Sequence, residues 1–218
     1  MYLQCLLLML VVNLTSAQDT LFLKDLNLKA IGKFNKYERK EGEWIFMYPE
    51  ANTVQSKGRY VNGNPEGYWI NYYPDGTKLA EGNYIKGKED GVWKHYDSKA
   101  RLIMTLTWVK GRKNGASTEW DFEKNELRQT VFKNDNYSGK ATWTSLSGHK
   151  IIEGHWQTGK KNGLWIWYYP NGAQKIRGVF RNDKEEGEHV YYSEEGNILN
   201  RVFYKHGIIS RVYRKKIF

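Results

Sequence analysis

The chain repeats itself every 24 residues, and this period limits what it can fold into more than any other feature. Glycines recur at 24-residue intervals from position 67, after a first interval of 25. They are Gly42, Gly67, Gly91, Gly115, Gly139, Gly163 and Gly187. Aromatic residues recur with the same period at Tyr60, Tyr84, Trp108, Phe132, Trp156, Phe180 and Tyr204. A period of this length indicates stacked units that bury apolar surface against their neighbours.

Each unit divides into two strand-like halves. In residues 67–90, the stretch 67–73 is rich in aromatic residues, and Tyr73-Pro74-Asp75-Gly76 has the composition of a turn. Residues 78–86 form a second strand, and residues 87–91 are expected to turn the chain into the next unit. Successive hairpins of this kind pair edge to edge. The sequence therefore predicts an all-β fold, a single elongated antiparallel sheet of tandem 24-residue hairpins growing by about 9.6 Å per unit.

A single sheet has no second layer to cover it, so its large side chains must pack on one another. Alternation places Trp69 and Asn71 on one face, and Tyr68 and Ile70 on the other. Rings are expected to stack on their counterparts one unit away. A further ladder of glycines would let them lie across the neighbouring backbone. This ladder consists of Gly58, Gly82, Gly154 and Gly178.

The central units depart from the pattern. A tryptophan stands two residues after the repeat glycine at Trp44, Trp69, Trp93 and Trp165. The central units have Ser117 and Ala141 there, and the last full unit has His189. The sequence WDFEKNEL (120–127) also replaces the Pro-containing turn. One interpretation is repeat drift; the other is a groove, left by two missing rings, that accepts a ligand or a partner segment.

The N-terminus has the features of an export signal. Residues 1–17 contain no charged side chain, an apolar run at 6–12 and small residues at 15–17. We expect cleavage before Gln18, the alternative being a buried N-terminal strand. Cleavage would remove Cys5, the single cysteine, so disulfides would play no part in the fold. The expected destination is the periplasm or the cell surface.

Four parts follow from these patterns. They are a signal peptide (1–17), an N-terminal cap with a degenerate first repeat (18–41), the tandem repeats (42–207) and a basic C-terminal cap (208–218).

The chain is basic, with a formal net charge of +10. This balance permits anionic partners such as a membrane surface or an acidic glycan, while export argues against nucleic acid. The simpler interpretation is a solvated repeat surface. The charges gather only in the tail, where a cap would discourage edge-to-edge growth and a membrane contact is the alternative. These tail residues are Arg211, Arg214, Lys215 and Lys216.

The unit G-x-W-x-x-Y-Y-x-x-G, followed by E-G-x-Y-x-x-G-x-x-x-G, resembles the MORN-type repeat. It is most similar to the variant form in the bacterial YwqK-type antitoxin family. Residues 67–91 and 154–172 match best, and the resemblance covers about residues 32–207. It implies a single-layer sheet of hairpins with roles in protein scaffolding, self-association and phospholipid contact. The antitoxin family further implies binding and neutralisation of a toxin, which an exported chain does not readily fit.

No catalytic constellation is present. The chain has no zinc-protease, nucleophile-elbow or phosphate-loop motif, and its five histidines share no repeat register. We expect no enzymatic activity, no catalytic residue, no metal site and no cofactor.

Two binding functions remain. The first is a scaffold whose exposed aromatic and basic side chains contact another protein. The second is a ladder of rings that stack on the sugars of a glycan or cell-surface polymer. Self-association is left open. The candidate binding residues are Tyr73, Trp120, Trp143, Trp167 and Tyr169.

Overall fold

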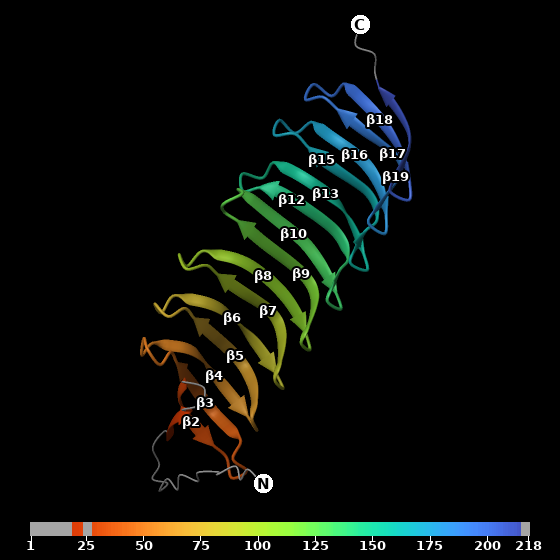
Figure 1. The fold of residues 1–218 in the computed structure, drawn as a ribbon. Helices are drawn as coiled ribbons and strands as arrows, with labels where there is room; N and C mark the ends of the chain where they lie inside the picture. The colour runs from red at the N-terminus through yellow and green to blue at the C-terminus, as the bar shows by residue number, and fades with distance from the viewer. Residues whose placement is uncertain (1–18, 24–27, 215–218) are drawn as a thin grey trace, which may run out of the picture.

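The computed structural model describes residues 19–23 and 28–214. This part of the chain forms one open antiparallel sheet without helices, which confirms the predicted all-β fold. Apart from the couples β11–β12 and β14–β15, which each share one strand position, every strand pairs with its neighbours in sequence, so the order across the sheet follows the chain from β1 to β19. The two ends of the array lie far apart (Figure 1). The predicted signal peptide lies outside the described residues.

The strands have the following bounds: β1 (Asp19–Leu23), β2 (Leu28–Phe34), β3 (Lys40–Met47), β4 (Val54–Val61), β5 (Asn64–Tyr72), β6 (Lys78–Ile85), β7 (Lys88–Tyr96), β8 (Leu102–Val109), β9 (Arg112–Asp121), β10 (Glu126–Lys133), β11 (Asn136–Tyr137), β12 (Gly139–Ser145), β13 (Lys150–Gln157), β14 (Lys160–Lys161), β15 (Gly163–Tyr168), β16 (Gln174–Arg181), β17 (Lys184–Tyr192), β18 (Ile198–Lys205) and β19 (Ile208–Arg214).

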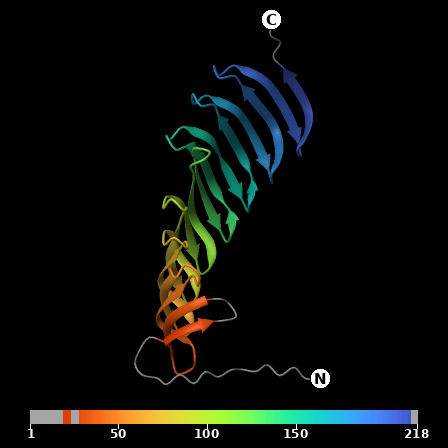
Figure 2. The ribbon, with the colours of Figure 1, turned by 60° about the vertical axis from the view of Figure 1, so that its left-hand side comes forward.

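Two of these strands are interrupted. β10 pairs with both β11 and β12, and β13 pairs with both β14 and β15, so each of these couples fills one strand position. The sheet twists along its length. In Figure 2 the N-terminal half is seen nearly along its plane, while the C-terminal half presents its strands broadside.

The turn between units is shorter than the sequence predicts. Lys86 and Gly87 both have a left-handed backbone, with φ of 50° and 77°, and together they reverse the chain in two residues. The assignment of residues 87–91 to a turn is therefore wrong. β7 (Lys88–Tyr96) begins directly after Gly87, so residues 88–91 belong to the strand. The other predicted turn is confirmed, since the Gly76 amide donates a hydrogen bond to the Tyr73 carbonyl at 2.9 Å.

Each unit tryptophan lies over a glycine of the preceding strand. A Cβ atom added at Gly58 would overlap the ring of Trp69, whose Nε1 donates a hydrogen bond to the Arg59 carbonyl at 3.2 Å. This confirms that the glycines let rings lie across the backbone. The arrangement recurs at Gly32–Trp44, Gly82–Trp93 and Gly154–Trp165, and with a histidine at Gly178–His189.

The rings also contact one another from unit to unit, as predicted. Tyr84 lies edge-on between Trp69 and Trp93, with ring centroids 6.0 Å and 5.0 Å away. Such contacts run from Phe34 to Trp93 and again from Phe132 to Tyr204. They supply the core of a sheet that has only one layer. The ladder is interrupted between these two runs, in the central units.

Candidate binding site in the centre of the array

Two central units lack the pairing of a glycine with an overlying ring that the other units have, and both residues of the pair are replaced. Where the other units have glycine and tryptophan, β8 and β9 place Leu106 opposite Ser117. The next unit has Thr130 and Ala141 in the corresponding positions. A larger residue replaces each glycine and a small residue replaces each tryptophan. The sheet stays covered, since Leu106, Ser117 and Ala141 are all buried, but two indole rings are absent from its face.

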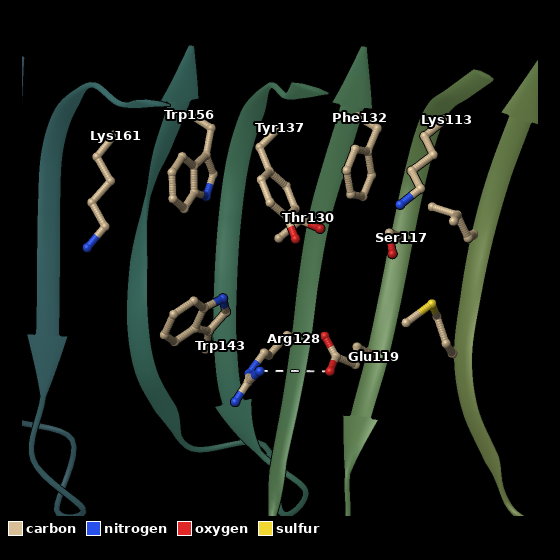
Figure 3. A pocket seen from close by; sticks show the side chains of 12 residues that line it. Lys113, Ser117, Glu119, Arg128, Thr130, Phe132, Tyr137, Trp143, Trp156 and Lys161 are labelled. Atoms are coloured by element: carbon tan, nitrogen blue, oxygen red, sulfur yellow. Dashed lines mark ion pairs between the residues drawn. The ribbon is translucent and has the colours of Figure 1, made fainter. Parts of the chain in front are cut away.

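A cavity of about 320 Å³ opens over these positions (Figure 3). Its floor consists of Leu106, Ser117 and Thr130. One side, here called the ring wall, consists of Phe132, Tyr137 and Trp156. The opposite side, here called the ionic wall, consists of Met104, Glu119, Arg128 and Trp143. Lys113 and Lys161 stand at the two ends (Figure 3).

The ring wall is a stack. The ring of Tyr137 lies between those of Phe132 and Trp156, with centroids 4.5 Å and 5.3 Å away and tilts of 33° and 30°. Rings at these distances and tilts pack on one another as a continuous apolar surface. Two indole Nε1 atoms of the central units, those of Trp108 and Trp156, are buried without a hydrogen-bond partner.

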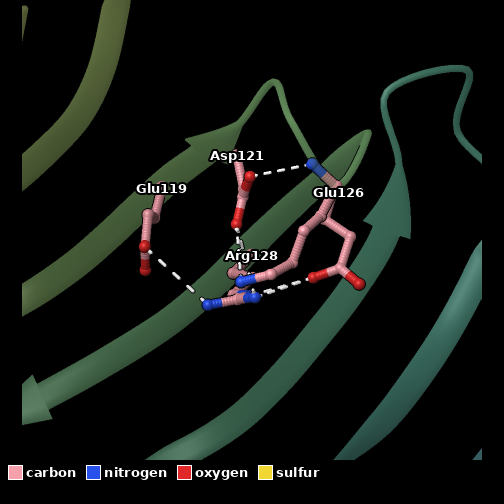
Figure 4. Close-up of polar contacts among 5 residues, drawn as sticks. Glu119, Asp121, Glu126 and Arg128 are labelled. Atoms are coloured by element: carbon pink, nitrogen blue, oxygen red, sulfur yellow. Dashed lines mark hydrogen bonds and ion pairs between the residues drawn. The ribbon is translucent and has the colours of Figure 1, made fainter. Parts of the chain in front are cut away.

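The ionic wall is organised by Arg128. Its guanidinium lies 2.8 Å from Glu126 and 3.8 Å from both Asp121 and Glu119 (Figure 4). The hydrogen bond to Glu126 raises the pKa of Arg128 above its usual value. On its other side the guanidinium lies 5.3 Å from the centre of the Trp143 ring. The charge of Arg128 is thus fully balanced within the protein.

The ammonium groups of the two lysines at the ends of the cavity lie against aromatic rings instead of carboxylates. Lys113 Nζ lies 5.4 Å from the centroid of Phe132, and Lys161 Nζ lies 4.8 Å from that of Trp165. Neither ammonium group forms an ion pair within the part of the chain that the structure describes. The cavity therefore has two available positive charges, one near each end.

The structure brings one candidate residue into this cavity, Trp143. Trp120 lines a separate, more open hollow with Arg101 and Phe122 near the β9–β10 turn. The hydroxyl groups of Tyr73 and Tyr169 donate hydrogen bonds to the carbonyls of Tyr96 and Tyr192, one unit further on.

Trp167 packs against Phe180, with ring centroids 6.0 Å apart. Two of the five candidates, Tyr73 and Tyr169, thus join successive units, while Trp167 packs within its own unit.

Sequence reasoning missed most of the cavity's lining. It identified the gap at Ser117 and Ala141 but not Lys113, Arg128, Tyr137 or Trp156. One signal was available for Tyr137. It stands where the neighbouring units have Lys113 and Lys161, so that a ring takes the place of a cation between two cations.

The basic tail is described only in part. β19 (Ile208–Arg214) pairs with β18 at the end of the array. The guanidinium of Arg211 donates a hydrogen bond to the Tyr213 hydroxyl at 3.0 Å. Lys215 and Lys216 lie outside the described residues, and Arg214 is described only in its backbone.

Within residues 19–23 and 28–214, no group of histidine, cysteine and acidic residues could hold a metal ion. The same part of the chain contains no helix with the length and apolar character needed to cross a membrane.

The MORN repeat variant family matches the chain at residues 65–86, 161–182 and 185–206. Repeats of this family are scaffolds that generally bind proteins or membranes. No curated protein matches the chain in sequence.

Two solved structures share local similarity with the chain. A TcdB2-TccC3-Cdc42 crystal structure is 12% identical over 80% of this chain, with a TM-score of 0.18. The Photorhabdus luminescens Tc holotoxin pore, with a mutated TccC3, is 9% identical over 87%, also with a TM-score of 0.18. The chain spans 10% and 15% of the length of these two chains.

Proposed function

We propose that this protein, whose chain carries variant MORN repeats, is an exported, non-enzymatic scaffold that binds a segment of another protein in its central cavity. The observation that carries the proposal is the paired exchange at Leu106–Ser117 and Thr130–Ala141. Exchange of both members keeps the sheet covered while it removes two rings from one face. Loss of the tryptophans alone would leave bare glycines beneath them.

The lining of the cavity suits a protein partner. Aromatic residues and arginine are enriched at the centres of protein interfaces. Trp143, Trp156, Tyr137 and Arg128 gather here, on the open face of a single-layer sheet. A glycan bound along the ladder would need ring faces open to solvent. The unit tryptophans instead lie buried against glycines, with Trp44 2% and Trp165 0% exposed.

Nothing in the cavity favours catalysis. The carboxylate of Glu119 faces Arg128, and the other two carboxylates near Arg128 are also held in ion pairs. Hydrogen bonds from Lys124 hold the pKa of Asp121 below its usual value, whereas a general acid or base needs a pKa close to the working pH.

Export and the identity of the partner form part of the proposal. Residues 1–17 support export through their composition. The resemblance to the antitoxin family implies a toxin as the partner, but export conflicts with that role, so the proposal commits only to a segment of another protein. The N-terminal residue of the protein purified from its native cells tests export directly. Gln18 at the start would support it, and an intact Met1 would contradict it.

The cavity can be tested by filling it with the repeat's own residues. The double change Leu106→Gly/Ser117→Trp restores the pair found in four other units. The new indole would lie over residue 106 and donate a hydrogen bond to the Thr107 carbonyl, as Trp69 does to that of Arg59. Tagged wild-type and filled proteins would be purified from the native cells, and the co-purifying proteins compared by mass spectrometry.

The account predicts one partner in stoichiometric amount with the wild type and at least tenfold less with the filled variant. A melting temperature unchanged within a few degrees would show that the filled variant is folded. Equal recovery of the partner with both proteins would place binding elsewhere on the array.

A further inference from the structure

The charge in the cavity is asymmetric. Arg128 is surrounded by Glu119, Asp121 and Glu126, so the ionic wall needs no further anion. The ammonium groups of Lys113 and Lys161 lie against rings and form no ion pair among the described residues, while their backbone amides donate hydrogen bonds to Asp135 and Asp183. Their ammonium groups extend over the same face of the sheet, on either side of the ring wall (Figure 3). Three carboxylates around Arg128 leave the ionic wall with a net negative charge, so the unpaired positive charge of the cavity is confined to the Lys113 and Lys161 ammonium groups beside the ring wall.

The ring wall lies between the two lysines, with its three rings packed on one another. The indole Nε1 of Trp156, a hydrogen-bond donor, lies on the side of its ring that faces Tyr137 and has no acceptor (Figure 3). A buried donor without a partner is unfavourable unless a ligand or water satisfies it. The two unpaired cations favour a ligand that supplies negative charge.

The spacing of the lysines limits the length of the ligand. Lys113 belongs to β9 and Lys161 to β14, and both stand two residues before a repeat glycine. Four strand steps separate them, which corresponds to roughly 19 Å along the array. An extended peptide rises about 3.3 Å per residue, so about five or six residues would span the distance.

We infer that the partner segment is an extended acidic peptide that runs along the array. It carries two carboxylates about five residues apart, one for Lys113 and one for Lys161. An apolar side chain between them covers Ser117, Thr130 and Leu106 on the floor. This inference rests on the proposed function, because it names the chemistry of the segment that the central cavity binds.

A library of random 12-residue peptides displayed on phage tests the inference. Phage would first be depleted on a protein with both central pairs restored, Leu106→Gly/Ser117→Trp and Thr130→Gly/Ala141→Trp. The remainder would be selected on the wild type. We expect enrichment of aspartate and glutamate, in pairs about five residues apart with an apolar residue between them.

The most frequent sequence, made as a labelled synthetic peptide, would then be titrated by fluorescence polarisation. Lys113→Gln and Lys161→Gln should each weaken binding about tenfold, and the affinity should fall as salt is added. Lys40→Gln is the matched control. Lys40 has the same repeat position and also packs on three rings, but it lies far from the cavity. Its replacement should leave the affinity unchanged.

The other outcomes separate the two claims. Cavity-dependent peptides without acidic enrichment, or equal effects of Lys113→Gln and Lys40→Gln, would overturn the acidic peptide and leave the peptide-binding cavity standing. Failure to recover any peptide that distinguishes the wild type from the filled protein would contradict both claims. A glycan would then be the remaining occupant.

Discussion

The fold requires glycine at two kinds of position, one for lack of space and the other for backbone conformation. A Cβ atom at Gly154 would overlap the indole of Trp165, so this glycine is needed for space. At Gly163 nothing lies within 4 Å, but φ is +75°, so this glycine is needed for its conformation. The sequence shows both as members of 24-residue ladders, and only the structure separates their roles.

The two roles predict different responses to substitution. Gly154→Ala should lower the free energy of unfolding by about 1–3 kcal/mol through overpacking, and Gly154→Asn by more. Gly163→Ala should cost about 1–2 kcal/mol, whereas Gly163→Asn should cost less than alanine, since asparagine tolerates a left-handed backbone. Urea unfolding of the four variants measures these differences. The same order of alanine and asparagine at both positions would contradict the assignment.

The lowered pKa of Glu81 predicts how the free energy of unfolding depends on pH. Burial alone would raise the pKa of Glu81, but hydrogen bonds from Lys78, Tyr96 and Tyr68 outweigh it and lower the pKa to about 2. A lowered pKa means that the ionised form stabilises the folded state. The contribution is complete above the unfolded pKa of about 4.5 and disappears as the pH falls towards 2.

The expected size is on the order of 3 kcal/mol. Urea unfolding at a series of pH values should show the wild type losing stability between about pH 5 and pH 2, and Glu81→Gln losing less. Equal slopes for the two proteins over this range would contradict the hydrogen-bonded carboxylate.

Hairpins are the elements of this array, and their turns vary more than their strands. The turn after β7 ends with Ala100 at φ +59°, where the corresponding turns have Gly76, Gly148, Gly172 and Gly196. Alanine in a left-handed backbone is strained. The Ala100 amide still donates a hydrogen bond to the Asp97 carbonyl at 2.9 Å, so the turn keeps its geometry despite the strain.

Ala100→Gly should therefore stabilise the protein. Relief of about 1–2 kcal/mol of strain is partly offset by the greater freedom of glycine in the unfolded chain, which leaves about 0.5–1 kcal/mol. A thermal melt should show a rise of about 1–4 °C. Gly76→Ala in the equivalent turn of β5 and β6 is the reciprocal control and should lower the melting temperature. A fall with Ala100→Gly would contradict the left-handed turn.

The sequence predicts hairpins well and their junctions poorly. Tyr73-Pro74-Asp75-Gly76 is recognisable because proline and glycine occupy turn positions with fixed backbone preferences. The two-residue turn at Lys86–Gly87 is less evident, because a lysine takes one of the left-handed positions and Gly91 suggests a longer turn. The lining of the cavity is also hard to predict from the sequence, because it depends on the register between paired strands. Ser117 marks the gap, but Arg128 and Tyr137 reach it only through cross-strand pairing that the chain order does not reveal.

At the scale of the whole molecule, the array is long and has one layer (Figure 1). With split strands counted once, the sheet from β1 to β19 has about 16 strand spacings, or roughly 77 Å. This length predicts a radius of gyration of about 24 Å, against about 17 Å for a compact domain of the same number of residues. Small-angle X-ray scattering of the monomer measures it. A value near 17 Å would contradict an extended single sheet.

The central claim is that a partner occupies the cavity between the ring wall and the ionic wall. Photo-crosslinking in the native cells tests it most directly, with benzoylphenylalanine replacing Trp143 in one strain and Trp167 in another. The two residues have the same position in successive units, but Trp143 lines the cavity while Trp167 packs on Phe180. The account predicts one defined crosslinked protein from position 143 and at least tenfold less from position 167. Equal crosslinking from both positions, or none from position 143, would contradict it.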